Sequence, residues 1–423
     1  MAQIHKRFTL EQVKVLLSSY ENGNLSRFDL QEVLGVGKTR FFEILKLFRT
    51  NPESFSIDYK RNNKSRLSME AEEKIRLFLE EEKALIDNPN LPIHTYNYSA
   101  INDRLKENGI EVSTTTVINR AKSYGYYFRR KKKTIVHDRE VLTSAVGDLI
   151  QHDASIHKWS PFANEKWTLI TSLDDHSRMI LFADFFERET SWAHIQAVQS
   201  LMQRYGVPHR YYVDNLRVFR FVQHRDSTWQ KITLGTDDVL TQWGRVMERM
   251  NTKIVYAMSP QAKGKIERPY GWLQDRLVRT CARQNISDIQ EAKEVLTQEV
   301  HRYNFHQVHS TTKEIPALRF EKAIKEKRSL FRPFAVPKPF SSPKDIFCIQ
   351  YQRVSNGYRK VSFAGKEFQI PGVNPYDDVE IHCVPDLENG IVELRFWCEN
   401  KMFFSTFLPL AIDRIKSSLL KFS

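Results

Sequence analysis

The chain has 423 residues and a formal net charge of +13, from 64 Lys and Arg against 51 Asp and Glu. This length predicts several domains rather than one core, and a hydrophobic content of 41% is sufficient for globular folding. A strongly basic chain favours an acidic polymer as its partner, although a merely basic globular protein has the same composition. The four cysteines are widely spaced and argue against a disulfide framework or a cysteine-based zinc site.

Residues 1–55 are predicted to form a small α-helical domain. The segment FTLEQVKVLLSSY is amphipathic, and DLQEVLGVGKTRFFEILKLFR gives a helix, a glycine turn and a second helix. In a helix-turn-helix, the first residues of the second helix, here Lys38, Thr39 and Arg40, point at base edges and phosphates. We therefore expect a DNA-binding domain, and the alternative is an ordinary helical hairpin.

Residues 65–135 repeat this pattern after a polar, basic linker, and we expect a second helix-turn-helix domain. SMEAEEKIRLFLEEEKALI predicts a helix with an acidic outer face, and YSAINDRLKENG predicts another. STTTVINRAKSYGYY predicts a second recognition helix, which carries Arg120. Five consecutive basic residues follow it: Arg129, Arg130, Lys131, Lys132 and Lys133. We expect this run to contact DNA phosphates, although a charge run is often only a solvated face.

Residues 140–325 change to a pattern of strands and helices. VGDLIQHDASI, KWTLITSLDD and RMILFADFF predict three strands, and SWAHIQAVQSLMQRYG predicts a helix after them. The strand YYVDN, the helix DDVLTQWGRVMERMN, the strand TKIVYAM and a long helix from AKGKIER then alternate. This order of elements predicts an α/β core with an RNase H-like fold.

Residues 345–423 contain five short alternating runs separated by turns such as Asn356-Gly357 and Asn389-Gly390. Short strands with turns of this kind predict a small C-terminal β-barrel. The prolines between residues 333 and 343 mark an extended linker that precedes it.

Three carboxylates stand in order along the core: Asp153 in QHDAS, Asp214 in YYVDN and Glu267 in SPQAKGKIER. The first two end strand-like runs, and the third opens a helix-like run. Carboxylate oxygens are the ligands that Mg²⁺ prefers, and two Mg²⁺ ions about 3.5–4 Å apart can catalyse phosphodiester cleavage. Each carboxylate alone is more simply explained as a turn cap or a solvated side chain. Together they predict a site for two Mg²⁺ ions, with Mn²⁺ as a substitute.

The segment 146–320 resembles the catalytic core of DDE transposases and retroviral-type integrases. The resemblance rests on SPQAKGKIER, on YGVP followed by YYVDN, and on VHRYNFHQVHSTTKEIPALRF, and it is strongest to bacterial insertion-sequence transposases of the ISNCY type. It implies that Asp153, Asp214 and Glu267 are the catalytic metal ligands. The flanking Lys263, Lys265 and Arg268 are expected to hold the DNA backbone.

The chain departs from the family in the spacing between Asp214 and Glu267, which is longer than usual. The extra residues fall in LRVFRFVQHRDSTWQKITLG, directly after Asp214. This basic and aromatic segment is either an inserted hairpin that contacts DNA or a second subunit, or a neutral surface insertion.

Other polar residues of the core are weaker candidates for the site. Asp174 and Asp175 occupy a hairpin turn, and we interpret them as turn formers. Asp148 precedes the apolar run of its strand, and His152 is interpreted as a packing or positioning residue. His301, His306 and His309 lack partners of the kind that form zinc sites, so we expect structural roles for them.

The resemblance implies a DNA transposase that binds the terminal repeats of its element, hydrolyses a terminal phosphodiester and transfers the 3′-OH strand to target DNA. The expected partners are double-stranded DNA, as element ends and as target, and further copies of the chain, at least as a dimer on DNA. Two alternatives stay open, a non-catalytic DNA-binding regulator with an RNase H-like core and a structure-selective DNA nuclease. The sequence shows no leader and no membrane-length apolar stretch, so we expect a cytoplasmic, nucleoid-associated protein.

Overall fold

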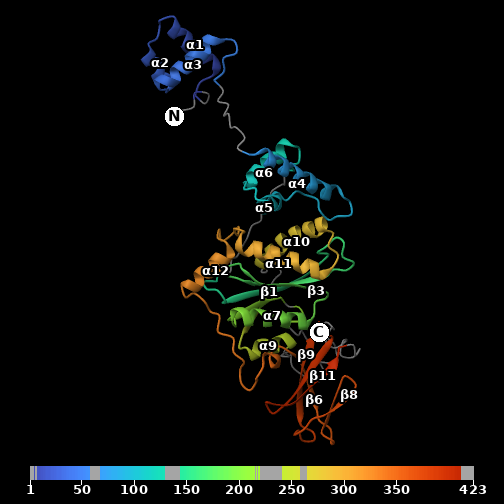
Figure 1. Ribbon diagram of the computed structural model, residues 1–423. Coiled ribbons are helices and arrows are strands. Elements are labelled where there is room, and N and C mark those ends of the chain that lie inside the picture. The colour runs from blue at the N-terminus through green and yellow to red at the C-terminus, as the bar shows by residue number, and fades with distance from the viewer. Residues whose placement is uncertain are drawn as a thin grey trace. The chain divides into compact units, whose positions relative to one another are not determined.

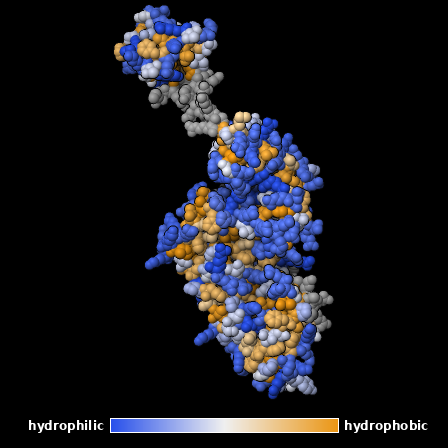
Figure 2. Space-filling view, in the orientation of Figure 1, coloured by the Kyte–Doolittle hydropathy of each residue, from blue (hydrophilic) through white to orange (hydrophobic). Residues whose placement is uncertain are grey.

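The computed structural model describes residues 4, 7–57, 67–128, 143–214, 216, 218–219, 241–257 and 264–410, with the backbone alone described for 264–268. The chain forms two compact units, Met1–Glu73 and Lys74–Ser423 (Figure 1). Figure 2 shows hydrophobic residues scattered among hydrophilic ones on the visible face, as on most folded proteins. Within the described ranges, no helix has both the length and the apolar character needed to cross a bilayer.

The described part of the first unit contains α1 (Leu10–Glu21), α2 (Arg27–Leu34), α3 (Lys38–Thr50) and the beginning of a further helix, α4 (Met69–Asp87). Capping boxes stabilise the starts of α1 and α2, because each N-cap hydroxyl and the third helical residue satisfy each other's backbone N–H groups. α2 ends at Gly35, whose φ of 66° is left-handed, so the chain turns sharply towards α3. The apolar faces of α1, α2 and α3 share one small core.

The second unit begins within α4 (Met69–Asp87) and continues with α5 (Tyr98–Glu107) and α6 (Thr114–Ser123). Asn97 and Ser113 cap α5 and α6, since their side chains accept hydrogen bonds from backbone N–H groups of the first turns. α5 and α6 pack against each other. The N-cap at Ser113 agrees with the expected start of this last helix.

The core of the second unit is a five-stranded sheet made of β1 (Leu149–His157), β2 (Trp167–Asp174), β3 (Ile180–Phe186), β4 (Arg210–Val213) and β5 (Lys253–Tyr256). Its strand order is β3-β2-β1-β4-β5. The pairs β1–β2 and β2–β3 are antiparallel, whereas β1–β4 and β4–β5 are parallel. This is the mixed α/β arrangement with the order of elements that the sequence predicted for an RNase H-like core.

Helices cover both faces of this sheet (Figure 1): α7 (Ser191–Tyr205) with α9 (Gln242–Arg249), and α10 (Gly264–Gln284) with α11 (Ile289–Phe305) and α12 (Pro316–Lys325). β2 is buried along its whole length because side chains pack against both of its faces. One hydrophobic cluster lies between the sheet and α10–α11, and another lies on the α7 face.

The C-terminal part contains two open sheets rather than the predicted β-barrel, which is not confirmed. After the short 3-10 helix η3 (Pro343–Asp345), the strands β6 (Ile349–Val354), β9 (Asp378–Asp386), β10 (Ile391–Cys398) and β11 (Lys401–Pro409) form one sheet of order β11-β10-β9-β6. β7 (Lys360–Phe363) and β8 (Lys366–Gln369) form a separate hairpin. The hairpin packs on the larger sheet through side chains, with Phe368 and Phe396 ring centroids 5.3 Å apart. It does not extend the hydrogen-bonded ladder from β6 to β11, and barrel closure needs such a ladder.

The C-terminal sheets are attached to α9. Gln242 exchanges two hydrogen bonds with the backbone of Gln350, at 2.7 and 2.8 Å. The Arg249 guanidinium lies 2.8 Å from a Glu380 carboxylate oxygen and 4.6 Å from the centre of the Phe340 ring. Because one hydrophobic cluster also runs from α7 and α9 into the C-terminal strands, both polar and apolar contacts hold these sheets to the core.

Candidate active site

Asp153 and Asp214 lie at the same level of two neighbouring parallel strands. Asp153 is in the middle of β1, and Asp214 directly follows β4. The last pair between β1 and β4 is Gln151 with Tyr212, so each aspartate lies two residues beyond the end of the β1–β4 pairing. Neighbouring strands are about 4.8 Å apart. The register therefore brings the two aspartates side by side, at the place where β1 and β4 stop pairing.

Both aspartates are partly buried. The Oδ1 atom of Asp214 accepts a hydrogen bond from the Leu216 N–H at 2.9 Å, which fixes the carboxylate at the end of β4. Asp153 stands opposite Thr171 in the antiparallel pairing of β1 with β2. Local backbone structure thus fixes the positions of both residues.

Tyr270 connects α10 to the strand that carries Asp153. Its buried hydroxyl donates a hydrogen bond to the Asp153 carbonyl oxygen at 2.7 Å and accepts one from the Thr171 hydroxyl at 2.8 Å. Burial raises the pKa of Tyr270 well above its usual range, and the Asp153 carboxylate raises this pKa further. α10 therefore passes directly over the β1–β2 pair at Asp153.

Glu267 lies in the first turn of α10, three residues before Tyr270. Positions three apart share one side of a helix, so the backbone at position 267 is on the side of α10 that faces Asp153. The side chains of Glu267, Lys265 and Arg268, and the whole of Lys263, lie outside the described residues. Among the side chains that are described, no group of three metal-binding residues gathers. The structure brings two of the three predicted carboxylates together and places the third residue's backbone in α10 above them.

The chemistry of the paired aspartates fits a hard divalent cation, because carboxylate oxygens on rigid strands are suitable Mg²⁺ ligands. The neighbouring Asp148 differs from them. Arg210 on β4 donates two hydrogen bonds to its carboxylate, at 2.8 and 2.9 Å. Asp148 therefore serves a structural ion pair and provides an acidic control position, directly before β1 and five residues before Asp153.

The opposite face of β1 carries a buried polar and aromatic cluster. The two ring nitrogens of His152 lie 2.8 Å from the Ser172 hydroxyl and 2.8 Å from the His194 ring, and His194 lies 3.2 Å from Glu189. Trp243 of α9 stacks on His152 with ring centroids 6.1 Å apart. His152 is thus a packing residue, as interpreted from the sequence, and its contacts fix β1 to α7.

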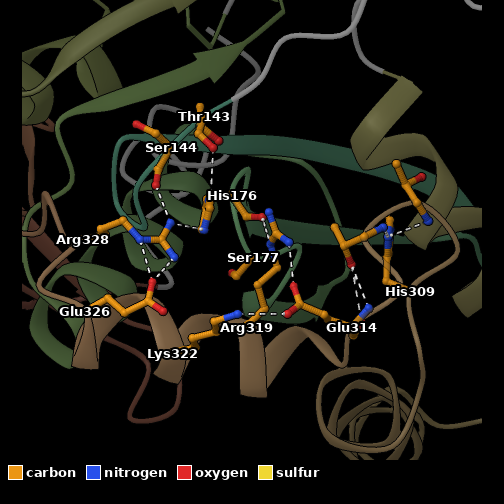
Figure 3. A network of polar contacts seen from close by, with 12 residues as sticks. Thr143, Ser144, His176, Ser177, His309, Glu314, Arg319, Lys322, Glu326 and Arg328 are labelled. Carbon is orange, nitrogen blue, oxygen red and sulfur yellow. Dashed lines mark hydrogen bonds and ion pairs between the residues drawn. The ribbon is translucent and has the colours of Figure 1, made fainter.

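The β2–β3 turn contacts both the segment that precedes β1 and α12. Figure 3 shows His176 of the turn beside Thr143. Asp174 accepts hydrogen bonds from the backbone N–H groups of Gly147 and Ser177, both at 2.8 Å. Arg319 of α12 donates to the His176 carbonyl oxygen at 2.9 Å. Burial raises the pKa of Asp174, and the hydrogen bonds from Ser177 and Gly147 oppose this rise. The turn aspartates are therefore structural, as expected, and lie outside the candidate site.

A separate set of arginines on α10 holds the α4–α6 helices. The side chains of Arg279 and Glu82 pair with each other and are 2% and 1% exposed. Arg276 lies 2.7 Å from Asp103. The sequence predicted an acidic outer face for α4, but Glu82 is one acidic residue of this helix that is buried. Sequence reasoning missed Glu82 and Tyr270 because each is defined by a partner far away in the chain.

The residues predicted to bind DNA are distributed over both units. Lys38, Thr39 and Arg40 are the first three residues of α3 and are exposed, and Arg40 pairs with Glu43 at 2.8 Å. Arg120 lies in the last turn of α6. The basic run 129–133 lies outside the described residues.

The segment inserted after Asp214 is described at Leu216, Val218 and Phe219, and its other residues from 215 to 235 lie outside the described ranges. Val218 and Phe219 are buried. The Phe219 ring lies 4.9 Å from the rings of both His194 and Trp243. The segment therefore begins as part of the hydrophobic core, a role that its composition alone did not predict.

No protein-family model matches the chain. Among solved structures, the chain is similar to one from the simian T-cell lymphotropic virus intasome, with 13% identity and a TM-score of 0.35, over 73% of this chain and 92% of that one. It is also similar to the HTLV-2 integrase catalytic core domain in complex with magnesium, with 16% identity and a TM-score of 0.29, over 40% of this chain and 92% of that one.

Two curated proteins are related to the chain in sequence. The protein y4bF of Sinorhizobium fredii, which is named as a transposase, is 28% identical over 196 residues, 46% of this chain and 41% of the relative. The transposase for insertion sequence IS1202 of Streptococcus pneumoniae is 30% identical over 169 residues, 40% of this chain and 35% of the relative. The match thus spans about two-fifths of the length of these relatives. Over that stretch the chain is a sequence relative of bacterial transposases, which confirms the resemblance that its motifs predicted.

Proposed function

We propose that the chain is a DDE-type DNA transposase, which binds the ends of its element, hydrolyses a terminal phosphodiester and transfers the 3′-OH strand to target DNA. One observation supports this most. Asp153 and Asp214 lie at one level of adjacent strands, and Tyr270 ties the helix that carries position 267 to Asp153. This arrangement supports a shared site for Asp153, Asp214 and Glu267, in a chain related to transposases over part of its length.

Asp153, Asp214 and Glu267 would hold two Mg²⁺ ions, or Mn²⁺ in their place. Such ions, when bound, activate the attacking oxygen and neutralise charge on the leaving oxygen. The protein contributes the position of each carboxylate. Asp153 is fixed by the β1–β2 ladder, and Asp214 is fixed by its turn contact with Leu216.

DNA binding is assigned to the helical parts and to the basic residues around the site. α2 and α3 would act as a helix-turn-helix, with Lys38, Thr39 and Arg40 reading bases and phosphates. α6 with Arg120 would be a second recognition helix, continued by the run 129–133. Lys263, Lys265 and Arg268 would hold the backbone of the cleaved strand. Because one event joins two element ends to a target, at least a dimer of the chain acts on DNA.

The test is strand cleavage and joining by purified full-length variants on DNA that carries both element ends, in Mg²⁺. Asp153→Asn and Asp214→Asn are each expected to abolish both steps while end binding stays within about twofold of wild type, since binding is carried elsewhere. Asp148→Asn is the matched control, because it removes the same charge from a residue paired with Arg210. It should cleave and join.

Three outcomes separate the proposal from its rivals. Joining by either site variant at a tenth of the wild-type rate would remove the assignment of the site. End binding by the wild-type chain without cleavage in Mg²⁺ or Mn²⁺ would favour a regulator. Cleavage of branched DNA without specificity for element ends and without joining would favour a structure-selective nuclease.

A further inference from the structure

Four aromatic rings form a continuous stack beside α5 and α6. In order along the stack they are Tyr127, Tyr98, Tyr96 and Phe128, with successive ring centroids 6.2, 5.8 and 6.1 Å apart. Successive ring planes differ by 21°, 7° and 19°. Near-parallel rings at such spacings are offset stacks, a favoured arrangement of aromatic groups.

The middle of the stack is buried, and the rings at its two ends are exposed to solvent. Tyr96 is 6% exposed, whereas Tyr127 is 40% and Phe128 is 65% exposed. The Tyr98 hydroxyl donates a hydrogen bond to the Tyr126 carbonyl oxygen at 2.8 Å, which fixes the segment 126–128 against the start of α5. The exposed rings are therefore pre-positioned, so a further ring that stacks on them has little ordering cost to overcome.

The surroundings of the stack are basic. The Lys122 Nζ atom lies 4.9 Å from the centre of the Tyr127 ring, and Arg120 shares the last turn of α6 with Lys122. Five basic residues, 129–133, follow Phe128 directly in the sequence. A flat π-surface with a cation at 4.9 Å from one of its rings matches a ligand that has both a flat ring and an anionic backbone, which is a nucleotide strand with an unpaired base.

We propose that the exposed face of Phe128 binds an unpaired nucleobase of DNA, which extends the ring stack, while Lys122 beside Tyr127 contacts the phosphates of the same strand. Stacking tolerates any base sequence, because every base has a π-face. This inference rests on the proposed action on DNA. It adds that the protein distinguishes unpaired from paired DNA strands through Phe128, which follows α6.

The test measures binding of the full-length chain in EDTA, so that cleavage does not occur. The probes are a short oligo-dT with one 2-aminopurine and a blunt duplex of arbitrary sequence. Phe128→Ala is expected to weaken oligo-dT binding by about 5- to 150-fold and to abolish quenching of 2-aminopurine fluorescence. Duplex binding should change by less than about twofold, and Phe128→Trp should retain both properties, because the indole ring also stacks.

The matched control is Phe305→Ala, which removes another exposed, stacked ring, 43% exposed and 4.8 Å from His301. It should bind both probes as wild type does. Unchanged oligo-dT binding by Phe128→Ala, or an equal loss on both probes, would overturn the inference. A wild-type chain that binds neither probe would instead contradict the proposed function, so the two failures are distinguishable.

Discussion

Replacing Tyr270 by Phe removes a single hydroxyl from between α10 and β1 and keeps the ring in its hydrophobic cluster. The Asp153 carbonyl oxygen and the Thr171 hydroxyl then lose the partner that they share. Thr171 and Tyr270 are 3% and 8% exposed, so a water molecule does not readily take the place of the lost tyrosine hydroxyl. A buried polar group left without a partner costs about 1–3 kcal/mol, and we expect the free energy of unfolding to fall by this amount.

The effect on strand cleavage should be larger than the effect on stability. Without the Tyr270 hydroxyl, the first turn of α10 is no longer fixed relative to Asp153, and the position of Glu267 changes with it. A misplacement of about 1 Å costs about 100-fold in rate, so we expect cleavage to slow by about 10- to 100-fold. The Mg²⁺ concentration for half-maximal cleavage should rise, whereas binding of element-end DNA should not change.

Tyr303→Phe is the matched control for this experiment. Tyr303 lies in the same hydrophobic cluster and is buried, but its hydroxyl has no hydrogen-bond partner among the described residues. This variant should keep the wild-type cleavage rate and unfolding midpoint. Wild-type cleavage and metal dependence in Tyr270→Phe would refute a positioning role, and equal defects in both variants would show that only ring packing is disturbed.

Two further predictions concern buried charges. Glu82→Gln should lower the free energy of unfolding by about 1–3 kcal/mol, because Arg279 loses its fully buried counter-charge and keeps only the partly exposed Asp275 carboxylate at 3.0 Å. The double variant Glu82→Leu with Arg279→Met should recover most of this loss, as measured by urea unfolding and by hydrogen exchange in α4–α6. Burial alone would lower the pKa of His382, but its contacts with Asp345, Cys348 and Glu380 raise it to about 10. Since the folded pKa lies above the unfolded value, this stabilisation is complete below about pH 6.5 and is lost as the pH rises towards 10. The unfolding midpoint of the C-terminal sheets should fall over that range in wild type, and His382→Gln should not show the fall.

The order of elements in the core was predictable because local patterns determine it. The segment WTLITSLD is rich in residues that favour strands and ends at the turn residues Asp174 and Asp175, so its sequence predicts a strand. In the structure it is β2, which is buried along its whole length. β-barrel closure was not predictable, because alternation in the C-terminal strands shows which residues face inward but not whether β6 reaches β11. That depends on the β7–β8 hairpin, whose residues pack on the larger sheet by side chains.

The candidate site was partly predictable for the same reason. Asp214 directly follows β4, as its strand-like run predicted, whereas β1 continues past Asp153 to His157, so the expectation that Asp153 ends its strand is wrong. The pairing of β1 with β4 nevertheless stops two residues before both aspartates. Tyr270 was missed because its partner is a backbone carbonyl group, which no motif encodes. Glu82 was missed because a glutamate in an acidic helix looks solvated until its buried partner, Arg279, is known.

α10 carries both the position of Glu267 and the Arg279 contact with α4, twelve residues apart. At 1.5 Å per residue this is about 18 Å along the helix axis, or roughly five base pairs of duplex at 3.4 Å each. If the proposed function is right, a helix of fixed length between the candidate site and α4 would keep a constant distance from the cleaved bond to the α4–α6 helices. The cleaved bond would then be chosen by counting from the bound repeat, so that the bases at the cut need not be recognised at all.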